Sequence, residues 1–210
     1  MMIAAAFLFG AAFSAVAVPD RYGEALSQRF PAWAVMNRRS AYVALDIVVR
    51  PDGSMMYCKV ARSEGSEKLA EQACSLVYNI RLIPAKGPDG TAIYGRTQLE
   101  IRFMSRGGRE QQNVAEVRRR PDLTVDDPAL TPVDGQKPRF QLAVLVKPDG
   151  TVGDCQPGST LRLSSEVAPP PPANLVALAC GQVMGSRRSR ILSQQNSPET
   201  YVDVLDVDVE

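Results

Sequence analysis

The sequence predicts an α+β fold in which one small unit, a three-stranded antiparallel sheet with one packed helix, occurs twice. The first observation is a shared stretch. Residues 42–53 and 139–150 both alternate apolar and mixed residues and then end in a basic residue followed by Pro-Asp-Gly. A period of two is typical of a strand with one buried face, and Pro-Asp-Gly is typical of a tight turn. The other two observations are a shared cysteine spacing and a closing strand in each copy.

A cysteine follows each turn glycine by five residues, Cys58 in the first copy and Cys155 in the second. A helical segment then carries the second cysteine of each copy, Cys74 or Cys180. Because a cysteine on the second strand can face one on the helix that covers the sheet, we expect the disulfides Cys58–Cys74 and Cys155–Cys180. Four cysteines allow three pairings, and a zinc site competes with them, although no CxxC pair supports it.

The helices and closing strands are predicted from periodicity. Residues 66–80 carry an apolar stripe near helical spacing after a serine that suits an N-cap, and residues 172–184 form the second helix after prolines. Apolar residues alternate with polar ones in the closing strands, 96–103 and 201–209. In the second of these strands the phase changes at Leu205, which predicts a bulge or a twist there.

The N-terminus resembles an export signal. Residues 1–17 are almost wholly apolar and end in a small-x-small pattern at residues 15–17. We therefore expect cleavage and a periplasmic or secreted protein, in which four cysteines form disulfides. The alternative is an uncleaved segment that anchors the chain to the inner membrane. The expected organisation is a signal peptide over 1–17, a first unit over 30–104, a linker over 105–138 and a second, degenerate unit over 139–210.

Composition argues against several classes of function. The net charge is +1, so bulk attraction to nucleic acid is not expected. Histidine is absent, which removes the commonest general base and metal ligand. The basic runs 118–120 and 187–190 are interpreted as solvated or paired charge, and we expect no catalytic residue, no metal and no cofactor. The acidic residues of the last strand are interpreted as the wet face of an edge strand: Asp203, Asp206, Asp208 and Glu210.

The first copy resembles the C-terminal domain of the TonB family. The resemblance covers residues 30–104, and the second copy matches more weakly through its Pro-Asp-Gly turn, its cysteine pair and Arg187. It implies a periplasmic domain that pairs a strand edge with a short peptide of an outer-membrane transporter. The motifs that carry it are Phe30-Pro31, Val48-Val49-Arg50-Pro51-Asp52-Gly53, Cys58 to Gly65, Arg81-Leu82-Ile83-Pro84-Ala85 and Gly90.

In this resemblance the last strand of the first copy lies at the sheet edge. We therefore expect a protein partner, an outer-membrane transporter or another envelope protein, and the same edges could join two copies of the chain. An exported enzyme of unrecognised type and a structural envelope protein are the alternatives. The residues expected to form the partner-binding edge are Arg96, Gln98, Glu100 and Arg102.

Overall fold

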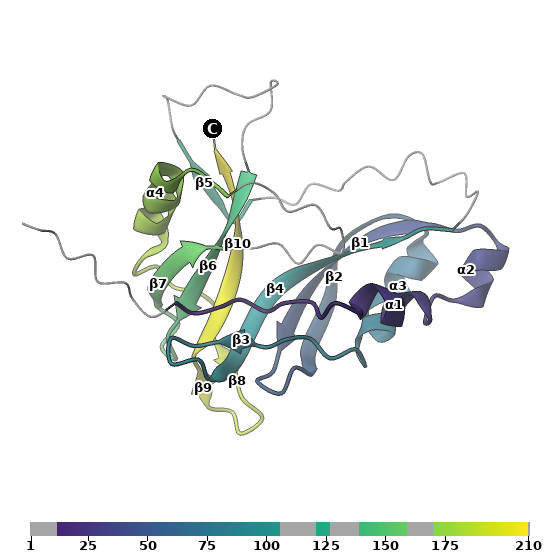
Figure 1. The fold of residues 1–210 in the computed structure, drawn as a ribbon, viewed down its shortest axis with the longest axis horizontal. Coiled ribbons are helices and arrows are strands. Elements are labelled where there is room, and N and C mark those ends of the chain that lie inside the picture. The colour runs from purple at the N-terminus through teal and green to yellow at the C-terminus, as the bar shows by residue number, and fades with distance from the viewer. Residues whose placement is uncertain (1–11, 106–120, 127–138, 159–169, 210) are drawn as a thin grey trace, which may run out of the picture.

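A computed structural model describes residues 12–105, 121–126, 139–158 and 170–209 (Figure 1). It is a mixed α+β structure, as predicted. Most of the expected linker, 105–138, lies outside the described residues, but residues 121–126 of it contain a short strand, β5. Among the described residues, no helix is both long and apolar enough to cross a membrane.

The first unit contains the predicted strand, turn, strand, helix and closing strand. The predicted helix over 66–80 is α3, and it begins after Ser66. Two short helices that the sequence did not predict precede the sheet. The elements are α1 (Tyr22–Ser27), α2 (Ala32–Met36), β1 (Ala41–Val49), β2 (Met55–Gly65), α3 (Glu67–Val77), β3 (Ala85–Lys86) and β4 (Ala92–Phe103).

The second unit follows the same order. Its helix, α4, lies within the predicted range 172–184, and its closing strand, β10, has the predicted bounds. A small hairpin, β8–β9, precedes β10 where β3 precedes β4 in the first unit. The elements are β5 (Leu123–Val125), β6 (Arg139–Val146), β7 (Val152–Pro157), α4 (Ala173–Val183), β8 (Ile191–Leu192), β9 (Pro198–Glu199) and β10 (Tyr201–Val209).

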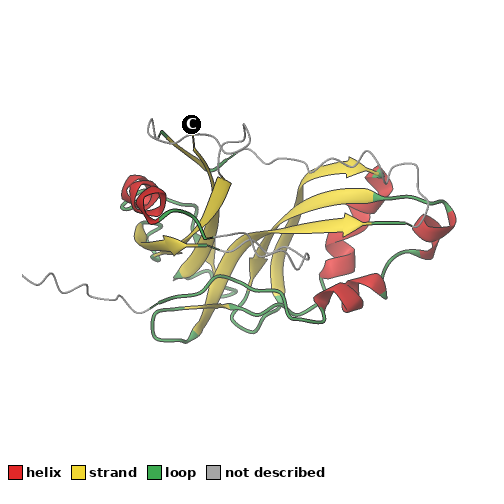
Figure 2. Cartoon of the chain, turned by 45° about the horizontal axis from the view of Figure 1, so that its top comes forward, coloured by secondary structure: helices red, strands yellow, loops and turns green. Residues whose placement is uncertain are grey.

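Except for β8 and β9, which form a separate two-stranded sheet, the strands of both units form one continuous sheet. Its main order is β2-β1-β4-β10-β6-β7, so each unit contributes three adjacent strands and the two closing strands meet in the middle. β4 and β10 run parallel, as do β5 and β10, whereas the other pairs within each unit are antiparallel. Figure 2 shows α3 near one end of this sheet and α4 near the other. Two separate sheets were expected. Instead, the closing strand of each unit pairs over part of its length with the closing strand of the other.

β10 is covered on both faces. Val202 belongs to the apolar cluster under α3, whereas Tyr201, Leu205 and Val207 belong to the cluster under α4. Neighbouring residues of a strand point to opposite faces, so both faces of this strand are buried. The predictions of an edge strand and of a bulge at Leu205 are therefore wrong: β10 pairs with β6 in unbroken register. In a strand buried on both faces, apolar residues do not occupy only every second position. The change of alternation at Leu205 therefore reflects burial on both faces and not a bulge.

The two Pro-Asp-Gly turns have the same construction. Gly53 and Gly150 have φ angles of 79° and 89°, which favour glycine. The Asp52 carboxylate accepts hydrogen bonds from the backbone and hydroxyl of Ser54, and Asp149 does the same for Thr151. These hydrogen bonds hold the pKa of both exposed carboxyls below the usual range.

The N-terminal segment is packed into the first unit. Ser14 and Lys86 exchange two backbone hydrogen bonds of 2.9 Å, and Ala17 and Ile83 exchange two more. Figure 1 shows this segment crossing β10 and β4 alongside β3. Its apolar side chains, Phe13 and Val16, are 3% and 2% exposed, so cleavage after Ala17 would remove two core side chains.

Candidate functional site

β4 is only partly an edge strand. It pairs with β1 from Gly95 to Phe103, but with β10 only at Tyr94, Gly95 and Arg96. The expectation that Arg96 lies on a free edge is wrong, because Asp203 of β10 is its register partner. Beyond Arg96 the two closing strands separate, and in the described part of the chain no strand pairs with residues 97–103 on the side away from β1.

Alternate residues of β4 direct their backbone groups toward that open side. The N–H of Arg50 donates to Ser54 O, so the backbone groups of Arg50 point toward β2. Neighbouring residues of a strand direct their N–H and C=O groups to opposite sides, so those of Val49 point toward β4. Val49 pairs with Gly95, and this ladder has no register shift, so odd-numbered residues of β4 bond to β1. The even-numbered residues point away from β1. They include Gln98, Glu100 and Arg102.

The side chains of these three residues lie on the face opposite α3. Gln98 donates from Nε2 to Asp46 Oδ1 at 3.1 Å. Glu100 is half-buried, and Arg102 is exposed with its guanidinium 6.0 Å from the centre of the Tyr42 ring. The intervening residues, including Leu99 and Ile101, are buried in the core. The open edge of β4 therefore carries polar side chains on one face, while the buried side chains of the other face fix the strand to the core.

A buried charge cluster lies where β4 and β10 separate. The Asp203 carboxylate is 2% exposed and accepts from Arg188 Nε at 3.1 Å, with Arg96 at 3.9 Å. Arg188 also lies 3.9 Å from Asp122, whose other carboxylate oxygen accepts the Asp206 N–H. Burial raises the pKa of the Asp203 carboxyl above its usual range, although both guanidiniums oppose this shift. The sequence pattern gave no sign of this cluster, because Asp203 alternates with valines like the other acids.

Tyr201 completes the cluster. Its hydroxyl donates to Ser189 O at 2.6 Å, and Arg96 lies 5.2 Å above its ring. Burial, reinforced by Asp203, raises the pKa of Tyr201 to about 12. The phenol therefore stays protonated and acts as a fixed donor, so the cluster is a structural joint between the units.

A cavity of about 490 Å³ adjoins this joint, on the face of the first unit's sheet opposite α3. Its floor is formed by β1 and β2, and its wall by residues 188–192 of the second unit. Exposed apolar side chains stand at its rim: Tyr57 is 49% exposed and Leu192 is 40% exposed. A cavity of this size could hold a few side chains of a bound peptide.

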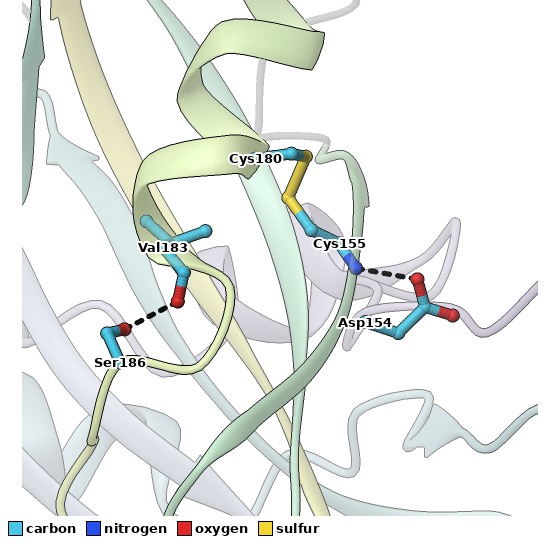
Figure 3. Close-up of a disulfide and its surroundings, with 5 residues drawn as sticks. All are labelled: Asp154, Cys155, Cys180, Val183 and Ser186. Carbon is cyan, nitrogen blue, oxygen red and sulfur yellow. Dashed lines mark hydrogen bonds between the residues drawn. A yellow bond between two sulfur atoms is a disulfide. The ribbon is translucent and has the colours of Figure 1, made fainter.

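The four cysteines form two disulfides inside their own units. Cys58 of β2 is bonded to Cys74 of α3, and Cys155 of β7 is bonded to Cys180 of α4. Figure 3 shows the second bond, beside the Cys155 N–H that donates to Asp154 Oδ1 at 2.7 Å. Each bond fastens a helix to the sheet. No reactive thiol remains, because no cysteine is free.

The remaining candidate residues are engaged in structural contacts. Arg139 forms an ion pair with Asp208, and Gln141 donates to Asp206 at 2.6 Å. Within the described ranges, no group of histidine, cysteine or acidic residues could hold a metal ion. Of the basic runs, 118–120 lies outside the described residues, whereas 187–190 includes Arg188 of the joint.

A partly open strand edge beside a cavity with exposed apolar side chains at its rim is typical of a domain that binds other proteins. Residues 27–104 match the family model described as "Gram-negative bacterial TonB protein C-terminal". The first unit is therefore similar to a TonB C-terminal domain, and the domains of this family are non-enzymatic, periplasmic interaction modules. The matched region ends just after β4, so it contains the first unit and stops before the second. Searches of curated proteins and of solved structures gave no match.

Proposed function

We propose that the protein acts in the periplasm as a binding module for an extended segment of an envelope protein, such as an outer-membrane transporter. The segment pairs with β4 between Thr97 and Phe103. The observation that carries this proposal is the outward orientation of backbone groups at Gln98, Glu100 and Arg102, beside which the described chain places no strand. Such groups are a template for an added strand.

The joint with β10 supports this proposal by limiting where a partner can pair. β10 occupies the edge at Tyr94–Arg96, and the buried Asp203 cluster fixes that contact. A partner strand therefore has a defined end point near Thr97. The parallel pairing of β10 with Tyr94–Arg96 supports a parallel orientation for the partner strand.

A proline at Glu100 tests the mechanism. Its N–H points away from β1, so Glu100→Pro removes a donor from the open edge and leaves the β1 ladder intact. The matched control, Glu100→Ala, keeps the amide. We expect Glu100→Pro to weaken partner binding about tenfold or more and Glu100→Ala to change it little, since a backbone bond in a shielded interface contributes about 1–1.5 kcal/mol.

The partner itself can be captured by photocrosslinking in the native envelope. p-Benzoylphenylalanine placed at Arg102 should give a specific adduct, whereas the same group at Tyr78, which is exposed at the end of α3, should not. If Glu100→Pro stays folded by circular dichroism and forms the Arg102 adduct as well as Glu100→Ala does, binding along β4 is wrong.

A further inference from the structure

The two units share a framework that extends to single hydrogen bonds. After each helix, the chain returns to the Pro-Asp-Gly turn and then forms a small hairpin. In the first two strands and the turn between them, a residue of the second unit is numbered 97 higher than its counterpart in the first unit. From the helix through the hairpin, it is numbered 106 higher. The matched backbone bonds are Leu82 N–H to Gly53 O and Arg188 N–H to Gly150 O, then Gly87 N–H to Thr91 O and Ser193 N–H to Ser197 O.

In the first unit, a groove beside this hairpin is filled by the chain's own N-terminal segment. Ser14 pairs with Lys86 through both its N–H and its C=O, at 2.9 Å each. Phe13 and Val16 are buried in a cluster that includes Ala143 of β6 and Val202 of β10. An extended apolar segment therefore fits a groove formed by the hairpin of one unit and the sheet of the other.

The corresponding groove of the second unit is the cavity. Its lining contains the counterparts of the residues that surround the N-terminal segment. On the hairpin, Ser189, Ile191 and Leu192 correspond to Ile83, Ala85 and Lys86, and on the sheet Asp46 and Val48 correspond to Ala143 and Leu145.

One part of this second groove is already filled. Ser189 O corresponds to Ile83 O, which accepts the Ala17 N–H at 3.0 Å. At Ser189 O the donors are instead the Tyr201 hydroxyl, at 2.6 Å, and the Arg96 guanidinium, at 3.4 Å. Tyr201 thus takes the place of the later half of an inserted segment, and the half beside Leu192 is open.

The backbone of Leu192 is oriented to accept a strand. Ser193 N–H donates to Ser197 O, so the preceding residue, Leu192, points its own N–H and C=O away from β9. Lys86 has this orientation in the first unit and uses both groups to bind Ser14. The residue opposite Leu192 is Pro198, which has no N–H to donate.

We propose that the cavity is a second acceptor site, for an extended segment of a partner protein with an aromatic residue followed by a small one. The small residue pairs with Leu192, and the aromatic side chain fills the cavity against Val48 and Ile191, as Ser14 and Phe13 do in the first unit. Arg190 replaces Pro84 beside this site and is exposed, without an ion pair among the described residues, so it favours an acidic residue in the partner. The pairing groups of this site lie on β8, and its lining includes Arg96 and Thr97 of β4 but none of residues 98–103.

The probe is a capped synthetic peptide with the sequence of residues 12–15 followed by two aspartates, in which p-benzoylphenylalanine replaces Phe13; this stretch stops short of Tyr201 and sets the first aspartate opposite Arg190. After irradiation with the full chain, we expect adducts at cavity residues such as Met56 and Leu192. Leu192→Pro removes the outward N–H and should weaken apparent affinity about tenfold, whereas Leu192→Ala keeps it and should bind as the parent does. Met56→Trp fills the cavity and should abolish the adduct without touching the hairpin.

Two results would overturn the proposal. Adducts at Ile83–Lys86 would mean that the peptide exchanges with the chain's own N-terminal segment, and adducts along β4 would assign it to the other edge. Equal labelling of the parent and Met56→Trp would exclude the cavity even if Leu192→Pro failed to fold. Since Glu100→Pro leaves the β8 site intact, failure of binding at β4 and failure at this cavity can be told apart.

Discussion

The two units share one backbone framework, but the groove beside the hairpin is filled in the first unit and partly empty in the second. In the first, residues 12–18 fill the groove beside the hairpin, and Gly95 leaves room for Val16, because a Cβ there would overlap that side chain. In the second, Tyr201 stands where Gly95 does and fills half of the corresponding groove, beside a cavity of about 490 Å³. A few side chains thus decide whether the same backbone forms a filled core or leaves a cavity.

Removing Phe13, the large side chain that fills the groove of the first unit, should have the largest effect on stability. Phe13→Ala should lower the free energy of unfolding by about 3–5 kcal/mol, because it opens a cavity in a core where Phe13 is 3% exposed. Urea denaturation measures this. The control is Leu192→Ala on the open side, which should change stability by less than about 0.5 kcal/mol. A loss below 1 kcal/mol for Phe13→Ala would mean that residues 12–18 are not part of the folded core.

The two disulfides should contribute nearly equally. Replacing both cysteines of either pair with alanine should cost about 3 kcal/mol, slightly more for Cys155–Cys180, because its sequence separation is 25 residues against 16 for Cys58–Cys74. Thermal unfolding of the two double variants gives this comparison, and non-reducing peptide mapping of the parent checks the pairing. A peptide linking Cys58 to Cys155 would break the comparison between units altogether.

Two glycine substitutions should change the free energy of unfolding in opposite directions. Gly95→Ala should destabilise by about 1–3 kcal/mol, because the added Cβ overlaps Val16 and lies 3.0 Å from the Ala85 Cβ. Gly181→Ala, inside α4 with nothing within 4 Å of its added Cβ, should stabilise by about 0.5–1 kcal/mol. Melting curves of the two variants suffice. A neutral Gly95→Ala would show that Val16 moves aside at no cost.

The smallest effect concerns the paired turns. The lowered pKa of Asp52 and Asp149 means that the folded chain binds these protons less tightly than the unfolded chain. Their stabilising contribution is therefore present above the ordinary aspartate pKa of about 4 and is lost as the pH falls below it. Asp52→Asn and Asp149→Asn should each flatten the stability profile between pH 5 and pH 3 by a similar, small amount. Unequal flattening would show that the two turns are not equivalent.

Local structure could be predicted from the sequence because its signals are local. Ser66 begins α3, the glycine turns recur, and the alternation in residues 96–103 marks β4. The joint between the units could not be predicted, because pairing of Arg96 with Asp203 depends on contacts between distant segments. The same contacts bury both faces of β10, so its acids, which indicated a wet edge, lie in the middle of a sheet.

The position of β10 also has a consequence for the order of folding. This strand follows every other described element along the chain, yet it lies between β4 and β6 and also pairs with β5. Until it arrives, β6 keeps a row of unsatisfied backbone groups and β4 keeps further ones at Tyr94–Arg96, and such groups are templates for aggregation. If the first unit closes early, we therefore expect an aggregation-prone intermediate that lasts until β10 pairs with β6 and β4.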